Sequence, residues 1–188
     1  MAKKLRRGFR KEAEEYAEEF RAELGLAAHA PLSAFGLAAL LEVPVTPLSA
    51  HPAVPEEVKA HFRDGGNSRF SATSLGDGTY REILHNDYQH PNRQNSNVMH
   101  ELSHIILGHP PHPPMLDDGC RHFDVEAELE ANQLGFTILV PKRAALFALE
   151  AFRDRQAAAD YFGVSLPLLQ HRIQITDVAG WAKNRTRR

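Results

Sequence analysis

Residues 97–109, NVMHELSHIILGH, limit the possible folds of this chain more than any other stretch. At about 100° per residue on a helical wheel, Val98, Leu102, Ile105 and Ile106 form one aliphatic stripe. Apolar residues at this spacing are typical of a helix that packs one face against a protein core. The stretch therefore predicts an amphipathic helix whose stripe is buried and whose opposite face is polar.

The opposite face of this predicted helix carries His100 and His104. Imidazoles at i and i+4 leave a helix about 6 Å apart, so two ring nitrogens can converge on one zinc ion. Glu101 lies at the edge of this face, where it suits a general base better than a ligand. His109 follows Gly108, a typical helix end, and is not counted as a ligand. The stretch predicts a metal site, and a core helix that only happens to contain histidines is the weaker alternative.

A catalytic zinc ion usually has a third protein ligand, and a second long helix predicted over 124–140 offers three glutamates. On the wheel, Glu128 lies beside an apolar stripe, whereas Glu126 and Glu130 point elsewhere. Because an unpaired buried carboxylate is costly, Glu128 is the predicted ligand, with Glu130 as the fallback. An ordinary solvated glutamate is the alternative for Glu128, and Asn132 can hydrogen-bond a ligand histidine. The stripe consists of Val125, Leu129, Asn132, Phe136 and Leu139.

A β-hairpin and further helices are predicted around these two helices. Residues 69–75 and 79–86 alternate in polarity on either side of the turn sequence GDG, which is typical of a hairpin. The proline-rich residues 109–120 form a loop between the two long helices. The other expected elements are helices over 9–24, 31–43, 55–62, 141–149, 154–161 and 165–174, and a short extended segment over 43–48.

Composition indicates one globular domain over residues 1–188, with 1–8 and 180–188 as basic, flexible ends. The 22 Lys+Arg and 24 Asp+Glu give a net charge of -2, so direct binding to nucleic acid is not expected. No apolar stretch reaches the roughly 20 residues of a membrane span, and no signal peptide is evident, which predicts a cytoplasmic protein. The single Cys120 excludes an internal disulfide. A redox-sensitive contact of Cys120 and His122 with the metal is a hypothesis, and an incidental loop cysteine is the alternative.

The two motif blocks together resemble the ImmA/IrrE family of metallopeptidases. The resemblance rests on NVMHELSHIILGH and, after a loop, on EAELEANQLGFTILVP, and it extends over roughly residues 10–178. It implies a zincin-like peptidase core with an α+β fold, mostly helical, whose small mixed or antiparallel sheet of about three strands packs on the HExxH helix. It further implies His100, His104 and Glu128 as ligands of Zn²⁺, or of Mn²⁺ or another divalent metal, and Glu101 as the catalytic acid and base.

The resemblance also implies a partner. Members of the family typically act with a helix-turn-helix repressor of the phage-repressor type, in stress responses or in the control of mobile elements. A zinc endopeptidase that cleaves such a repressor is the first functional hypothesis, and a non-catalytic anti-repressor on the same fold is the alternative. Ser103 stands where the family often has glycine, beside the metal face. The activating signal, the cleavage site and the oligomeric state are left open.

Two further features of the site are expected with alternatives. Tyr88, His90 and Arg93, just upstream of the metal helix, are candidate donors to the oxyanion of the transition state, although such loops often carry polar residues without a catalytic role. One strand of the hairpin, 69–75 or 79–86, can present its edge to an extended peptide, although a purely structural hairpin is equally expected.

Overall fold

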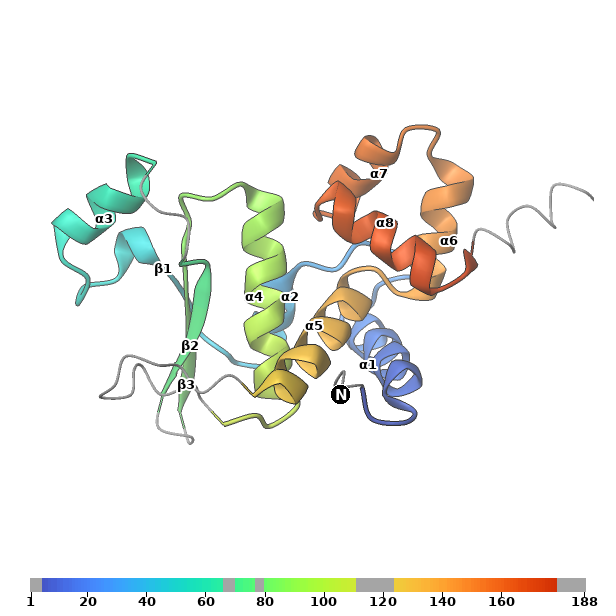
Figure 1. Cartoon of the computed structure of the whole chain (residues 1–188), viewed down its shortest axis with the longest axis horizontal. Coiled ribbons are helices and arrows are strands. Elements are labelled where there is room, and N and C mark those ends of the chain that lie inside the picture. Colours follow the sequence, from blue (N-terminus) through green and yellow to red (C-terminus); the bar gives the residue numbers. More distant parts are fainter. Residues whose placement is uncertain (1–4, 66–69, 77–79, 111–123, 179–188) are drawn as a thin grey trace, which may run out of the picture.

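The structure, a computed structural model, describes residues 5–65, 70–76, 80–110 and 124–178. Figure 1 shows a small β-sheet with helix α3 on one side, helix α4 in the middle, and α1 and α5–α8 on the other side. The predicted α+β class, mostly helical with a small sheet packed on the HExxH helix, is confirmed. The helices are α1 (Phe9–Glu23), α2 (Ala34–Leu40), α3 (Glu56–Arg63), α4 (Pro91–Ile106), α5 (Val125–Leu139), α6 (Lys142–Ala151), α7 (Arg155–Tyr161) and α8 (Leu166–Ile175), with a 3₁₀ turn η1 (Leu48–Ala50).

The sheet is mixed and has the strand order β1-β3-β2. Strands β2 (Ala72–Gly76) and β3 (Arg81–His85) form the predicted antiparallel hairpin. The short segment expected to be extended becomes β1 (Val45–Pro47), which pairs with β3 in parallel. Since β3 is central, β2 lies at one edge of the sheet, and β2 and β3 both contact α4.

Helix α4 begins at Pro91, before residues 97–109, the stretch from which it was predicted. Pro91 occupies the first turn, where its missing N–H costs nothing, and the His90 side chain accepts from the Asn92 N–H. At the other end Gly108 adopts a left-handed conformation with φ 68°. The Gly108 N–H donates to the Ile105 carbonyl (3.0 Å) and the His109 N–H to the His104 carbonyl (2.9 Å). These two bonds form a Schellman motif, which ends the helix and folds the chain back over its last turn.

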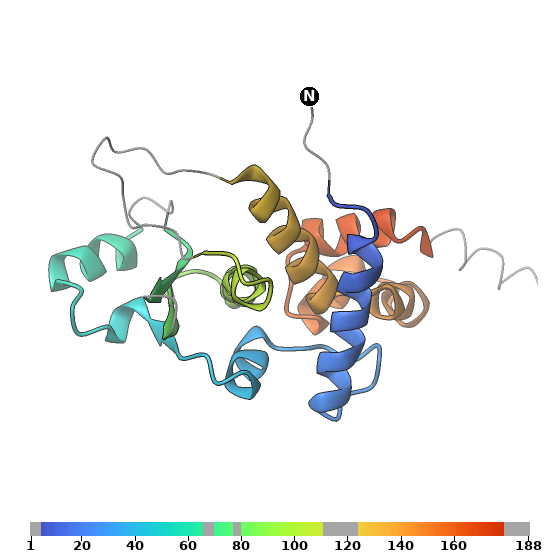
Figure 2. The ribbon, with the colours of Figure 1, turned by 90° about the horizontal axis from the view of Figure 1, so that it is seen from below.

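The core lies where α4 passes between the sheet and α5, and Figure 2 shows α4 end-on in this position. Val98 and Leu102 are fully buried, as the aliphatic stripe predicts, whereas Ile105 and Ile106 are half-buried near the end of the helix. Each fully buried aliphatic side chain contributes about 1.5–3 kcal/mol to folding. The polar face of α4 is therefore held at a fixed orientation by the core beneath it.

Helices α4 and α5 approach closely at Ser103 and Gly135. Ser103 is fully buried, and its Oγ donates to the Met99 carbonyl (2.7 Å). A Cβ at Gly135 would lie 3.1 Å from Ser103 Oγ. Ser103 thus faces α5, and the absence of a side chain at Gly135 makes room for it.

Helix α2 is shorter than predicted, because Ser33 caps its N-terminus and Glu42, with φ 54°, follows its end. The three closing helices agree with the prediction, and Asp154 and Ser165 cap α7 and α8. None of the described helices is both long and apolar enough to cross a membrane. Most residues of the two predicted flexible ends lie outside the described residues.

Candidate metal centre

Three predicted ligands from two helices converge on one point. His100 and His104 project from α4, and their Nε2 atoms are 3.1 Å apart. Glu128 projects from the first turn of α5, with Oε2 3.3 Å from His100 Nε2 and Oε1 3.4 Å from His104 Nε2. All three ligand atoms lie within 4.8 Å of one another. We call these three residues the metal-ligand cluster.

The spacing within the metal-ligand cluster fits a divalent metal. Ligand atoms placed tetrahedrally at about 2.0–2.1 Å from zinc lie about 3.3 Å from each other, close to the three distances observed. Two imidazoles and a carboxylate also form a ligand set found in catalytic zinc sites. The side chain of Glu128 is only 15% exposed. A carboxylate so poorly hydrated needs positive charge nearby, which a bound cation would supply.

Within the metal-ligand cluster, His100 and Glu128 shift each other's pKa. Burial lowers the pKa of His100, but hydrogen bonding to Glu128 and the charges of Glu101 and Glu128 outweigh it, so the pKa lies above its ordinary value. Hydrogen bonds from His100 and then His104 hold the pKa of Glu128 well below its usual range. Asn132 also raises the pKa of His100, and its Nδ2 donates to the Glu128 carbonyl (2.8 Å). Glu128 is therefore an ionised acceptor at neutral pH.

Glu101 is placed beside the metal-ligand cluster and is fastened to the sheet. Its Oε2 accepts a hydrogen bond from the backbone N–H of Ser74 (2.9 Å), which lies on the edge strand β2. The negative charge of Glu101 raises the pKa of His100, so the two side chains are near each other. This position beside the ligands, rather than among them, is the one predicted for a general base.

Glu130 does not join the metal-ligand cluster. Its Oε2 lies 3.7 Å from His109 Nε2, and its Oε1 accepts from Arg6 Nε (3.0 Å). His109 in turn contacts His104, with the two Nδ1 atoms 2.9 Å apart. The sequence analysis placed the end of the helix at Gly108 but did not predict that the turn at this glycine brings His109 back against His104. The glycine after the last helical turn was the signal that could have found it.

The three candidate oxyanion donors lie around the start of α4. The backbone N–H of Tyr88 donates to Asn86 Oδ1 (3.1 Å), and His90 caps the helix. Arg93 precedes His100 by seven residues, which is two helical turns or about 10 Å along the axis. The roles of Tyr88, His90 and Arg93 as oxyanion donors therefore stay predictions. Cys120 and His122 lie outside the described residues.

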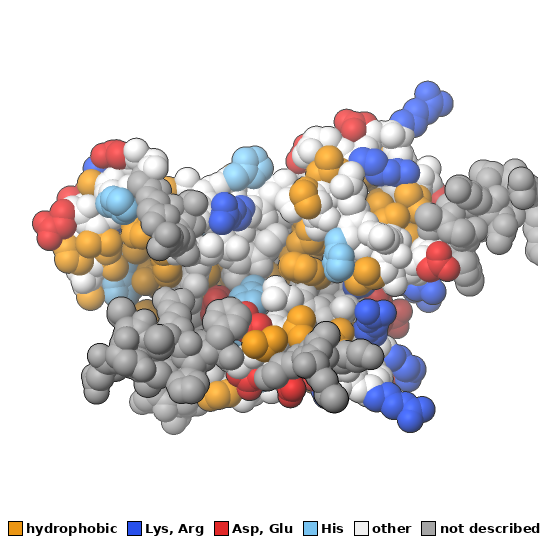
Figure 3. Space-filling model, in the orientation of Figure 1, with side chains coloured by type: hydrophobic (Ala, Val, Ile, Leu, Met, Phe, Trp, Pro, Cys, Tyr) orange, Lys and Arg blue, Asp and Glu red, His pale blue; other side chains and the backbone are white. Residues whose placement is uncertain are grey.

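The apolar stripe predicted for α5 is buried only in its second half. Leu139 is fully buried and Phe136 is half-buried, but Val125 is 41% and Leu129 is 36% exposed. Figure 3 shows apolar side chains in orange over α5 in the lower middle of the face. The first turns of α5 extend beyond α1 and leave these two residues beside Glu128. The prediction of a continuous buried stripe is wrong there, because the wheel gives direction but not the length over which a neighbour covers a helix.

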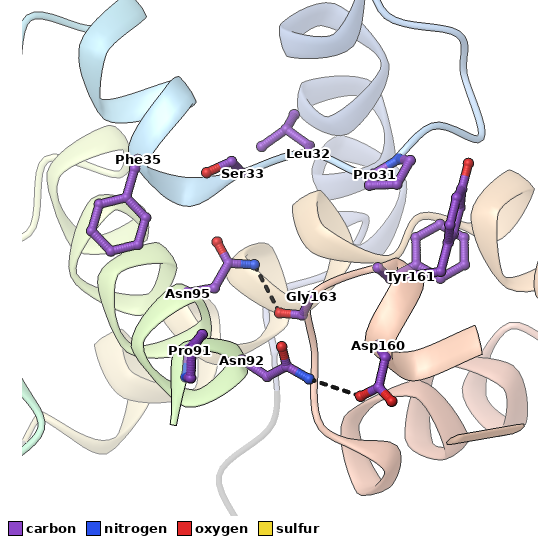
Figure 4. A pocket seen from close by; sticks show the side chains of 11 residues that line it. Pro31, Leu32, Ser33, Phe35, Pro91, Asn92, Asn95, Asp160, Tyr161 and Gly163 are labelled. Carbon is purple, nitrogen blue, oxygen red and sulfur yellow. Dashed lines mark hydrogen bonds between the residues drawn. The ribbon is translucent and has the colours of Figure 1, made fainter. Parts of the chain in front are cut away.

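A pocket of ≈ 310 Å³ lies at the opposite end of α4, between the α7–α8 turn and residues 31–35 (Figure 4). Asn95 Nδ2 donates to the Gly163 carbonyl (2.9 Å), and its Oδ1 accepts from the Ala34 N–H (2.8 Å). Asn92 donates to Asp160 and to the Val164 carbonyl. Because these amides are already paired with the protein, they join α4 to its neighbours and are not arranged for a ligand.

A family model gives an independent comparison. The model described as the IrrE N-terminal-like domain, of a peptidase family, matches residues 57–174, more than half of the chain. The match contains the metal-ligand cluster, Glu101 and the edge strand β2. No curated protein matches the chain significantly.

Proposed function

Because this chain belongs to the IrrE N-terminal-like family of peptidases, we propose that it is a zinc-dependent endopeptidase that hydrolyses a peptide bond in a protein substrate. The observation that carries the proposal is the convergence of His100, His104 and Glu128, with Glu101 fastened beside them. Zinc is the proposed metal because it favours two imidazoles and a carboxylate with one coordination position left open. Mn²⁺ is the second choice.

The residues of the site have separate roles in the proposed hydrolysis. When bound, the metal supplies Lewis acidity, which lowers the pKa of a water molecule and polarises the scissile carbonyl. Glu101 takes a proton from the attacking water and then passes it to the leaving amine. The Ser74 N–H holds one oxygen of Glu101 in place, and the carboxylate still has lone pairs for that proton. Tyr88 is the proposed donor to the oxyanion.

Strand β2 is the proposed place for the substrate backbone. It lies at the edge of the sheet, and Ser74 in its middle contacts Glu101. An extended peptide that adds to this edge as a further strand therefore passes the general base. The exposed Val125 and Leu129, beside Glu128 on α5, offer apolar contacts to its side chains. This arrangement favours a flexible protein segment over a small compact molecule.

The proposed substrate is a helix-turn-helix repressor of the phage-repressor type, whose cleavage would relieve repression in a stress response or in a mobile element. The near-neutral net charge of -2 supports action through the repressor rather than by direct binding to DNA. The partner to test first is a repressor encoded by a neighbouring gene.

The decisive experiment incubates the purified protein, with Zn²⁺ or Mn²⁺, with that repressor and follows cleavage by mass spectrometry. Glu101→Gln is expected to keep the metal and to abolish cleavage, because the amide cannot take the proton. Glu126→Gln, the same change at an exposed position of α5, is the matched control and is expected to cleave normally. Cleavage by Glu101→Gln at the normal rate would refute the mechanism. Tight binding of the repressor without cleavage by any form would favour the non-catalytic anti-repressor.

A further inference from the structure

The Schellman motif at the end of α4 brings His109 against a predicted metal ligand. In this motif the residue after the glycine commonly makes an apolar contact with the residue four positions before that glycine. Here those residues are His109 and His104, which are joined by the bond between the His109 N–H and the His104 carbonyl. The two rings contact each other with centroids 5.0 Å apart and an interplanar angle of 65°. An apolar contact has been replaced by a contact between two imidazoles.

The nitrogens that face each other admit only one arrangement of protons compatible with metal binding. His104 directs Nε2 towards His100 and Glu128, and Nδ1 towards His109 Nδ1 at 2.9 Å. If His104 Nε2 offers its lone pair to a metal, the proton of His104 must be on Nδ1. His109 Nδ1 must then accept this proton in a hydrogen bond, so the proton of His109 must be on Nε2.

The groups beyond His109 favour this arrangement. His109 Nε2 lies 3.7 Å from Glu130 Oε2, so a proton on Nε2 faces a carboxylate. The other oxygen of Glu130 accepts from Arg6 Nε at 3.0 Å, and Arg6 also pairs with Glu12 at 2.6 Å. The side chains of His109 and Glu130 are 14% and 19% exposed. In this arrangement each proton on the path from Arg6 through Glu130 and His109 to His104 therefore faces an acceptor.

We propose that His109 is a positioning residue for His104 and that Glu130 orients His109, so that together they hold the tautomer in which His104 offers Nε2 to the metal. This inference rests on the metal site of the proposed function. A ligand histidine that donates its other ring N–H to a neighbouring group binds metal more tightly, and removal of such a partner weakens metal affinity about 10–100-fold. The acceptor in zinc proteins is usually a carboxylate or carbonyl, whereas here it is an imidazole followed by a carboxylate.

The first test measures the Zn²⁺ affinity of the full chain by competition with a chromophoric chelator. His109→Leu, which removes the acceptor, is expected to bind Zn²⁺ about 10–100-fold more weakly. His109→Asn is expected to restore most of the affinity, because its Oδ1 can accept in place of Nδ1. Glu130→Gln is expected to weaken binding less than His109→Leu, and Glu126→Gln, one turn earlier on α5, is the control that should leave the affinity unchanged. Thermal unfolding in chelator checks that each variant is folded.

The second test needs no substitution. Long-range ¹H–¹⁵N correlation spectra of the zinc-loaded chain at neutral pH report which nitrogen of each imidazole carries a proton. The proposal expects His104 protonated on Nδ1 and His109 neutral and protonated on Nε2. A His109 protonated on Nδ1, or on both nitrogens, would overturn it, as would a folded His109→Leu variant with unchanged Zn²⁺ affinity. Absence of Zn²⁺ binding by the unaltered chain would instead overturn the metal site itself, and the inference with it. Tight metal binding without peptide cleavage would leave the positioning role in place and refute only the proposed enzyme.

Discussion

Two polar clusters lie along helix α5, and they differ in whether positive charge is built into them. The metal-ligand cluster near its start joins His100, His104 and Glu128, whose potential metal-binding nitrogen and oxygen atoms all face one another. The arginine cluster at its end consists of Glu14, Arg21 and Arg172, in which guanidinium donors face acceptors. The metal-ligand cluster gathers potential metal ligands around a point that suits a cation, whereas the arginine cluster contains its own cations.

The arginine cluster is complete within the protein. Arg21 and Arg172 are each 1% exposed, and they donate to the carbonyls of Ile138, Leu139 and Val140 at the end of α5. Arg172 also pairs with Glu14 at 2.6 Å. Burial lowers the pKa of Arg21 to about 10, so the guanidinium stays charged at neutral pH. Helix ends leave carbonyls without partners, and here side chains from α1 and α8 supply the donors.

The difference teaches how the two functions of α5 are separated. The arginine cluster fastens α1 and α8 to the end of α5 and depends on no ligand. The metal-ligand cluster holds Glu128 at the other end, where α5 packs against α4. Removing a member of the arginine cluster should therefore change stability, and removing a member of the metal-ligand cluster should change metal binding.

The largest effect is expected for Glu128→Ala. Zn²⁺ at about 1,000 times its dissociation constant should stabilise the unaltered chain by about 4 kcal/mol, because metal binds only the folded state. The variant should lose nearly all of this stabilisation, since one of three ligands is missing. Urea unfolding with and without Zn²⁺, with exposed Glu126→Gln as the control, measures it. If Zn²⁺ stabilised Glu128→Ala as much as the unaltered chain, Glu128 would not be a ligand.

The next largest effect is expected for Arg172→Met. The variant should lower the free energy of unfolding by about 3 kcal/mol, because it removes the donor to the Val140 carbonyl and the buried cation that pairs with Glu14. Its Zn²⁺ affinity should not change. Arg143→Met, which removes an exposed arginine paired with Glu18, is the matched control and should cost close to zero. A weaker metal affinity in folded Arg172→Met would show that the two clusters are coupled through α5.

A smaller effect is expected where α4 and α5 cross, between the two clusters. Gly135→Ala gains helix propensity, but its new Cβ would lie 3.1 Å from Ser103 Oγ. Ser103→Ala removes that oxygen, so Gly135→Ala should be more favourable in the Ser103→Ala background by about 0.5–1 kcal/mol. Denaturant unfolding of the two single variants and the double variant gives this coupling. Additive effects would mean that the crossing relaxes without cost.

The smallest effect concerns Asp87, a half-buried carboxylate outside both clusters. Partial burial raises the pKa of Asp87, but hydrogen bonds from Ser49 more than offset it, so the pKa lies below its ordinary value. A depressed carboxyl pKa contributes stability above about pH 4, and this contribution is lost as the pH falls through the folded-state pKa. Ser49→Ala should therefore cost less than about 1 kcal/mol at pH 6 and still less at pH 3. A deficit that is the same at both pH values would contradict this assignment.

Local periodicity carried most of the predictions that agree with the structure. The i and i+4 spacing of His100 and His104 places both rings on one helical face in any fold that keeps the helix. The direction of Glu128 relative to Glu130 also follows from the wheel, because both lie within one regular helix. The hairpin is local as well, since β2 ends at Gly76 and β3 begins at Arg81.

Predictions that extended a local pattern beyond its neighbours were less successful. The stripe of α5 was expected to be buried throughout, yet Val125 and Leu129 are exposed because the first turns project beyond the helices that cover the rest. Arg21 and Arg172 follow no pattern that distinguishes them from surface arginines, and only their positions opposite the end of α5 bury them. The parallel pairing of β1 with β3 likewise joins segments that are far apart in the chain.

The sequence by itself determined which residue types can bind a metal and on which faces of two helices they lie, because helical geometry repeats within a few residues. Only the tertiary structure decided that these faces meet, that Ser74 on β2 holds Glu101, and that Arg6 and Glu130 stand behind His109. Each of these contacts joins elements separated along the chain. Their distance in space depends on how α4 is packed between the sheet and α5, which no local pattern specifies.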